Sequence, residues 1–162
     1  MALAKITLQD FRNHAMSELT GTAHFNLLVG ENGAGKTNVL EAISLLSPGR
    51  GLRRAALADL ARKASPDAQP GAFAIGASLI EQGQVSARIG TYTEAARPTR
   101  RLVRINGADA SASALSEWHA VSWLTPSMDG LFTDSAGARR RFMDRMALAI
   151  EPGHAKAVGQ LE

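Results

Sequence analysis

The sequence predicts an α/β fold in which an antiparallel β insertion follows a strand, a glycine-rich loop and a helix. Residues 25–29 form a short apolar run closed by glycine, and apolar side chains then recur every three to four positions across 36–46. Residues 73–105 instead alternate apolar and polar side chains, as strands do. The chain has 162 residues, so one domain is expected at roughly 150 residues per domain.

Composition and charge exclude several classes of protein. The chain has no cysteine, which excludes disulfides, thiolate nucleophiles and cysteine metal sites. No apolar run reaches the ~18 residues of a membrane span, and Lys5 and Asp10 interrupt the N-terminal segment where a signal peptide is apolar. We therefore expect a cytoplasmic protein with no membrane partner. The net charge of +3 is too small to indicate a nucleic-acid partner by itself.

The first expected elements are two strands and a helix. Residues 5–11 alternate Ile and Leu with polar side chains, which predicts a half-buried strand. Residues 25–29 (FNLLV) are expected to form a buried strand. An amphipathic helix is expected from Lys36 and should end before Pro48.

Short helices and hairpins are expected in the middle of the chain. We expect short helices at 57–63 and 113–119, and strands at 73–80, 85–92, 101–105 and 121–124. The dipeptide Asn106-Gly107 is the favoured two-residue hairpin turn because both positions tolerate positive φ.

A second long helix is expected near the C-terminal end, at residues 136–150. Asp134 or Ser135 can cap its start. Its apolar stripe consists of Ala138, Phe142, Met146 and Ile150.

The strongest chemical signal is a glycine-rich loop between the second strand and the first helix. It fits the P-loop pattern G-x-x-x-x-G-K-S/T without a mismatch, through Gly30, Glu31, Asn32, Gly33, Ala34, Gly35, Lys36 and Thr37. Glycines let successive N–H groups face one phosphate, and the helix start adds unpaired donors. Lys36 is predicted to reach the β- and γ-phosphates of ATP, and Thr37 to offer its hydroxyl to Mg²⁺.

A P-loop alone does not choose among small GTPases, nucleotide kinases, recombinase-type ATPases and transporter-type ATPases. Four stretches, taken in order, resemble the RecF family of the SMC and Rad50 group, which are ABC-type ATPases acting on DNA. They are LQDFRN at 8–13, LVGENGAGKTNVLEAI at 28–43, RING at 104–107, and TPSMD at 125–129 with RRRFMD at 139–144.

The resemblance implies a fold and a function for residues 1–162. It implies the N-terminal P-loop lobe of an ABC-type ATPase head, with further motifs lying downstream. It also implies binding of single-stranded and duplex DNA, ATP-dependent homodimerisation, and recombinase loading with recombination-mediator proteins in replication, repair and the SOS response.

The resemblance also assigns residues near the nucleotide. Arg12 and Asn13 are expected to approach it beside the P-loop. Residues 126–129 would sense the Mg²⁺ and γ-phosphate region, although Ser127 and Asp129 leave open which residue, if any, does so.

Two motifs of a complete ABC-type head are missing from the sequence. We find neither an apolar run followed by Asp-Glu nor an L-S-x-G signature. No catalytic residue is therefore assigned within this chain, and hydrolysis is left undecided. Two alternatives stay open: a nucleotide-binding module without catalysis, and the head of another SMC-like DNA-linked ATPase.

Arginine clusters supply the candidate DNA surface. Arg97, Arg100, Arg101 and Arg104 alternate along one expected strand and could share a face toward DNA. Two other groups of arginines lie at 50–54 and 139–145. For residues 139–141 a solvent-exposed helix face and a phosphate contact are equally compatible with the pattern.

Overall fold

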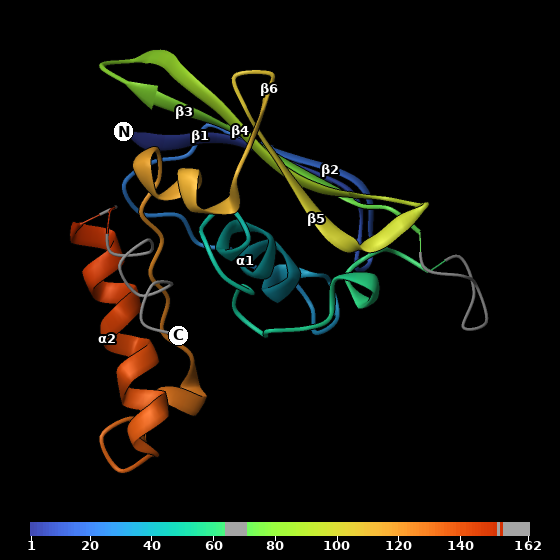
Figure 1. Cartoon of the computed structure of the whole chain (residues 1–162). Coiled ribbons are helices and arrows are strands. Elements are labelled where there is room, and N and C mark those ends of the chain that lie inside the picture. Colours follow the sequence, from blue (N-terminus) through green and yellow to red (C-terminus); the bar gives the residue numbers. More distant parts are fainter. Residues whose placement is uncertain (64–70, 152, 154–162) are drawn as a thin grey trace.

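Six strands form one sheet in the computed structural model, which describes residues 1–63, 71–151 and 153 (Figure 1). The strands are β1 (Ala2–Phe11), β2 (His14–Thr20), β3 (Ala74–Glu81), β4 (Gln84–Glu94), β5 (Arg97–Ile105) and β6 (Ala108–Ala110). Their order is β2-β1-β3-β4-β5-β6, and every neighbouring pair is antiparallel. The predicted antiparallel hairpins are therefore confirmed, and β1 joins their sheet.

The sheet buries one face and leaves the other open. Ile6 and Leu8 on β1, like Ile75 and Leu79 on β3, point to the buried face, as the period-two pattern predicted. Asn106 and Gly107 have φ of 51° and 85°, so the predicted tight turn joins β5 to β6.

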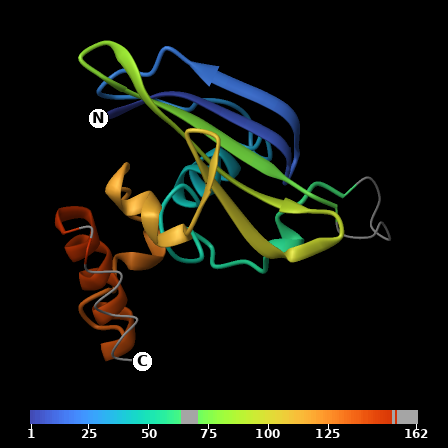
Figure 2. The same cartoon turned by 45° about the horizontal axis from the view of Figure 1, so that its top comes forward.

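Helix α1 (Lys36–Ser44) packs against the buried face of the sheet (Figures 1 and 2). Its residues Val39 and Ala42, with Leu45 just beyond it, belong to the core that the inward side chains of β1, β3, β4 and β5 complete. Phe11 and Phe73 close one end of this core edge to face, with ring centroids 5.5 Å apart. The core thus fixes α1, and with it the start of the P-loop helix, relative to the sheet.

The buried strand expected at residues 25–29 is wrong. The structure assigns no strand there, and Phe25, Leu27 and Val29 are 96%, 86% and 81% exposed. A strand needs a neighbour to pair with its backbone, and among the described residues every named strand lies in the antiparallel sheet instead. Only Leu28 of this segment packs against the core.

Three further expectations need correction. Residues 121–124 form no strand, and Leu124 is 80% exposed. The helix expected at 57–63 is only the 3₁₀ turn η1 (Leu57–Asp59), because Ala61 instead bridges to Phe11 on β1. Residues 112–117 form the 3₁₀ helix η2 (Ala112–Glu117), a tighter turn than expected.

Helix α2 (Ala136–Ile150) has the expected bounds, but its apolar stripe is not buried. Ser135 caps it by accepting a hydrogen bond from the Ala138 N–H at 3.2 Å. No residue of α2 is buried, and Ile150 is 82% exposed. The stripe fails as a core because α2 lies beside the sheet-and-α1 unit and is not inserted into it (Figure 1).

Candidate nucleotide-binding site

The P-loop runs from Gly30 into the first turn of α1, and two of its glycines are required by geometry. Gly33 and Gly35 have φ of 87° and 97°, a region that favours glycine. A Cβ on Gly35 would also lie 2.6 Å from the His14 ring and 2.7 Å from the Asn13 amide oxygen. Glycine at position 35 therefore lets the β1–β2 turn press directly on the loop.

Lys36 folds back over the loop. Its Nζ donates to the carbonyl oxygens of Gly30 at 2.7 Å and Glu31 at 2.8 Å. The Ala34 N–H donates to Glu31 at 3.2 Å, which tightens the turn beneath the ammonium group. The loop thus holds one positive charge over its backbone, at the place where the motif requires a phosphate ligand.

The first turn of α1 offers further donors. The earliest N–H groups of a helix have no intrahelical partner, and the Thr37 side chain is exposed on this turn. Among the described residues no group of three His, Cys, Asp or Glu could hold a metal ion. Mg²⁺ commonly takes few protein ligands and relies on phosphates and water, so a single Thr37 hydroxyl fits such an ion.

The β1–β2 turn supports the loop from one side; the approach of Asn13 to a nucleotide stays a prediction. Asn13 Nδ2 donates to the Gly33 carbonyl at 3.1 Å, and Asn38 Nδ2 on α1 donates to Asn13 Oδ1 at 2.8 Å. His14 Nε2 lies 3.3 Å from the Gly35 carbonyl, while its Nδ1 lies 2.8 Å from Ser17 Oγ. Sequence reasoning did not single out His14 or Asn38; the only available signal was His14 following Arg12-Asn13 in the same turn.

Arg12 lies beside the loop but is directed at Glu41. Its Nε and Nη2 each donate to a Glu41 carboxylate oxygen at 2.9 Å, and its Nη1 donates to the Asp59 carbonyl at 3.1 Å. Glu41 is 2% exposed and also receives Arg53 at 3.3 Å. Two arginines from different loops therefore neutralise one buried carboxylate, a fork geometry suited to guanidinium groups.

These contacts link five polar side chains around the first half of α1, and the peptide bond between Arg12 and Asn13 completes the ring. Arg53 also donates to Asn38 Oδ1 at 3.0 Å, which links Glu41 back to Asn38 and Asn13. The ring, consisting of Arg12, Asn13, Asn38, Glu41 and Arg53, reaches the P-loop through the Asn13 bond to Gly33. Sequence reasoning missed Glu41 because its partners lie 29 and 12 residues away.

The four predicted DNA-contact arginines do not share one face, so that expectation is wrong. Arg101 points to the α1 side, where it donates to Thr91 Oγ1 at 2.8 Å, Gly49 O at 2.8 Å, Ser47 O at 3.1 Å and Leu45 O. Burial lowers the Arg101 pKa to about 10. Its guanidinium satisfies carbonyls beyond the end of α1, a structural task.

The other three arginines are exposed. Because side chains alternate along a strand, Arg100 and Arg104 lie on the open face, opposite Arg101. Arg97 is exposed at the start of β5. Arg104 Nε donates to Asp109 at 3.1 Å, and its guanidinium lies 5.3 Å from the centre of the Tyr92 ring.

The segment expected to sense the γ-phosphate forms the 3₁₀ helix η3 (Pro126–Met128), which precedes the turn into α2. Thr125 accepts the Met128 N–H at 2.8 Å, and Asp129 is exposed. The side chain of Ser127 lies outside the described residues. A sensing role here stays a prediction.

Fold and loop together define the class: a P-loop lobe of the ABC-type ATPase heads, with an antiparallel sheet covering the P-loop helix. Residues 2–127 match the family model described as the RecF/RecN/SMC N terminal domain. The chain belongs to this family. The resemblance to RecF is thereby confirmed.

Curated relatives are similar over almost the whole chain. The DNA replication and repair protein RecF of Rhizobium rhizogenes is 46% identical over 162 residues, which are 99% of this chain and 42% of that protein. RecF of Brucella suis is 50% identical over 159 residues, 98% of this chain and 40% of that protein. The chain therefore spans about two fifths of the length of these relatives.

Solved structures share the fold. The recombination mediator protein RecF with ATPrS matches with a TM-score of 0.78 at 22% identity, covering 93% of this chain and 39% of that one. An SMC ATPase from a study of ATP-driven dimerization and DNA-stimulated activation matches with a TM-score of 0.63 at 19% identity. That match covers 90% of this chain and 99% of the SMC chain, so this lobe is a recurring structural unit.

Within residues 1–63, 71–151 and 153, no helix is both long and apolar enough to cross a bilayer.

Proposed function

We propose that the protein binds ATP and Mg²⁺ at its P-loop and acts in DNA replication and repair as a lobe of a RecF-like ATPase. The observation that carries the proposal is the loop itself: Lys36 is held across a turn made by Gly33 and Gly35, at the start of α1. The similarity to relatives named DNA replication and repair protein RecF supports the biological setting.

Each part of the loop has a task in this proposal. Lys36 exchanges the Gly30 and Glu31 carbonyls for β- and γ-phosphate oxygens, and the first-turn amides donate to the same phosphates. Thr37 holds Mg²⁺ through its hydroxyl, and the ion when bound neutralises phosphate charge. Asn13 keeps the loop curled by its bond to Gly33, so the donors are arranged before ATP arrives.

We extend the proposal to the partners that the resemblance implies. Residues 1–162 act as the N-terminal lobe, bind single-stranded and duplex DNA, and dimerise when ATP is bound. With recombination-mediator proteins, the protein supports recombinase loading and the SOS response. Two structural relatives support this direction, since one is the recombination mediator protein RecF and the other is an SMC ATPase with ATP-driven dimerization and DNA-stimulated activation.

A second candidate is a nucleotide-binding module without hydrolysis. The sequence has no apolar run followed by Asp-Glu that could activate water, and no L-S-x-G signature. Under this candidate, ATP binding controls only the conformation and the binding of partners, and ATP hydrolysis requires residues that this sequence does not contain.

The test is ATP binding measured by calorimetry, with Lys36→Ala beside the wild type. We expect measurable, Mg²⁺-dependent ATP binding that Lys36→Ala weakens by at least tenfold, since a charge-assisted phosphate contact contributes about 1.5–3 kcal/mol. Lys63→Ala is the matched control, because Lys63 is exposed and outside the loop. Equal ATP binding by Lys36→Ala and wild type would refute the site; turnover assays on the same samples separate the two candidates.

A further inference from the structure

A chain of hydrogen bonds leads from a partly exposed arginine to the backbone of the P-loop. Arg53 Nη1 donates to Asn38 Oδ1 at 3.0 Å, and Asn38 Nδ2 donates to Asn13 Oδ1 at 2.8 Å. Asn13 Nδ2 then donates to the Gly33 carbonyl at 3.1 Å. The Arg53–Asn38–Asn13 chain thus joins a side chain that is 45% exposed to the middle of the glycine-rich loop.

The two ends of this chain fix the direction of every bond in it. A guanidinium group only donates hydrogen bonds, and a backbone carbonyl only accepts them. Asn38 therefore presents its oxygen to Arg53 and its NH₂ group to Asn13, which leaves the Asn13 NH₂ group for Gly33. An aspartate at position 38 would still accept from Arg53 but would have nothing to donate to Asn13. The chain depends on the amide chemistry of Asn38 and not only on its size.

At the loop end, the chain sets the direction of one backbone donor. The peptide bond from Gly33 to Ala34 is trans, so its C=O and N–H groups point in opposite directions. Because the Gly33 carbonyl is held toward Asn13, the Ala34 N–H points away from it and donates to the Glu31 carbonyl at 3.2 Å. Lys36 Nζ donates to the same Glu31 oxygen at 2.8 Å. Two donors of the loop therefore converge on one oxygen atom.

The arginine end is anchored at the far end of α1. Arg53 Nη1 also lies 3.3 Å from a carboxylate oxygen of Glu41, which is buried. The Leu52 N–H donates to Ser44 Oγ at 2.7 Å, which ties the loop that carries Arg53 to the last turn of the helix. The hydrogen-bond chain is therefore formed before any ligand binds.

We propose that Asn38 is a positioning residue for phosphate binding: oriented by Arg53, it acts through Asn13 to hold the Gly33 carbonyl outward and so aims the Ala34 N–H at the phosphate. The proposal rests on the proposed function, since it takes the P-loop as the ATP site. A phosphate oxygen that replaces the Glu31 carbonyl meets the Ala34 N–H and the Lys36 ammonium already directed at a common point. No peptide rotation is then needed, which lowers the cost of binding.

The experiment measures Mg²⁺-dependent ATP binding by calorimetry for wild type, Asn38→Ala, Asn13→Ala and the double variant. We expect Asn38→Ala to bind ATP about fivefold more weakly, because one neutral hydrogen bond that orients the loop is lost. Adding Asn38→Ala to Asn13→Ala should change little, because both substitutions break the same chain and their effects are not additive. Asn26→Ala is the matched control and should bind ATP like the wild type, since the Asn26 amide bonds to the backbone of Ala23 ahead of the loop.

Asn38→Asp separates positioning from helix stability. An acidic residue in the first turn is favoured by the helix dipole, so the urea midpoint of Asn38→Asp should be unchanged or higher. Its ATP binding should nevertheless fall by more than that of Asn38→Ala, since the carboxylate cannot donate to Asn13. In the Asn13→Ala background the fall should be smaller, because only the added charge then acts on ATP.

The amide resonance of Ala34 reports on the chain without ATP. Its ¹⁵N and ¹H chemical shifts should change in ligand-free Asn38→Ala and stay unchanged in Asn26→Ala. Wild-type ATP affinity of Asn38→Ala, multiplicative losses in the double variant, or an unchanged Ala34 resonance would overturn the proposal. Lys36→Ala is measured beside these variants: if it alone weakens ATP binding, the positioning role fails and the P-loop site stands. If Lys36→Ala binds ATP like the wild type, the P-loop site itself fails.

Discussion

Single residues in this protein are fixed by what they touch across long stretches of sequence. Gly35 is glycine because the Asn13 amide and the His14 ring occupy the space of a Cβ. Arg101, which reads as a DNA contact in the sequence, instead satisfies carbonyls that follow α1. The sequence predicted that the arginine side chains of β5 are cationic, but it did not predict which face of the sheet each one lies on.

Substitutions at Gly33 and Gly35 of the P-loop separate the cost of backbone strain from the cost of a lost side-chain contact. Gly33→Ala should cost about 1–2 kcal/mol in the free energy of unfolding, because left-handed backbone disfavours a Cβ and nothing lies within 4 Å of it. Gly35→Ala should cost about 1 kcal/mol more, since displacing Asn13 breaks its bond to Gly33. Urea unfolding measures both, and equal costs would contradict the proposed contact. In an Asn13→Ala background the difference should shrink.

At the scale of elements, α1 is held by packing beneath and by the polar ring around its first half. Glu41 is the member of the ring that is buried, and Arg12 and Arg53 reach it from opposite loops. Losing one arginine therefore leaves a buried carboxylate short of compensation, which is more costly than losing a surface charge.

The Arg12–Glu41 pair should behave asymmetrically. Arg12→Ala should lower the free energy of unfolding by about 3 kcal/mol, because Glu41 stays buried with one partner. Adding Glu41→Gln should recover part of that loss, since the buried charge is removed. Glu18→Ala, which breaks the exposed pair with Lys5, is the control at under about 1 kcal/mol. Equal effects of Arg12→Ala and Glu18→Ala in chemical denaturation would contradict this account.

The segment before the P-loop should tolerate polar substitution. Phe25→Ser and Leu27→Ser should each change the free energy of unfolding by less than about 0.5 kcal/mol, because both side chains are almost fully exposed. Leu45→Ala, at a side chain 2% exposed, should cost about 2–5 kcal/mol in the same assay. A loss of unfolding free energy for Phe25→Ser close to that for Leu45→Ala would contradict this account and support the buried strand that the sequence predicted.

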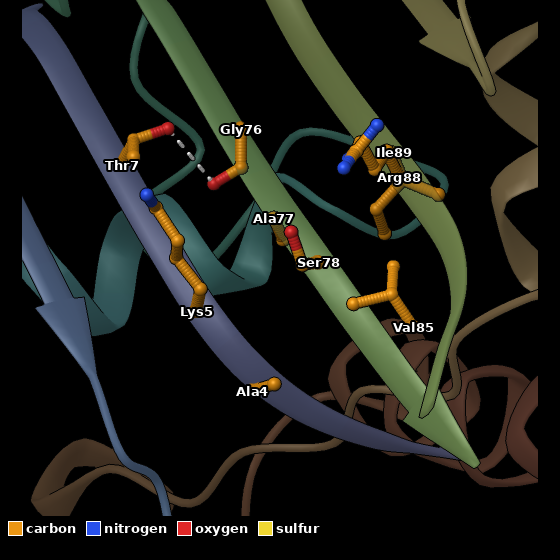
Figure 3. Close-up of a pocket in the computed structure, with 9 residues that line it drawn as sticks. All are labelled: Ala4, Lys5, Thr7, Gly76, Ala77, Ser78, Val85, Arg88 and Ile89. Carbon is orange, nitrogen blue, oxygen red and sulfur yellow. Dashed lines mark hydrogen bonds between the residues drawn. The ribbon is translucent and has the colours of Figure 1, made fainter. Parts of the chain in front are cut away.

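Over the whole molecule, structure that depends on neighbouring residues could be predicted from the sequence, whereas the pairing of distant segments could not. The P-loop, the bounds of α2, the strands with alternating side chains and the Asn106-Gly107 turn follow from neighbouring residues. The segment 25–29 has the composition of a strand, yet an apolar run carries no information about whether a partner strand exists. The same limit hid the contacts of Glu41 and the hollow over β1, β3 and β4 (Figure 3), since both assemble from residues that lie far apart in the chain.

The central claim is that the loop from Gly30 to Thr37 is the nucleotide site, and amide hydrogen exchange tests it most directly. We expect ATP with Mg²⁺ to slow exchange at the loop and at the first turn of α1, because their N–H groups become phosphate donors. Amides of β3 and β4 in the sheet should be unchanged, and Lys36→Ala should need at least tenfold more ATP for the same slowing. Unchanged exchange at residues 30–37 under saturating ATP, or slowing confined to the open face, would contradict the claim.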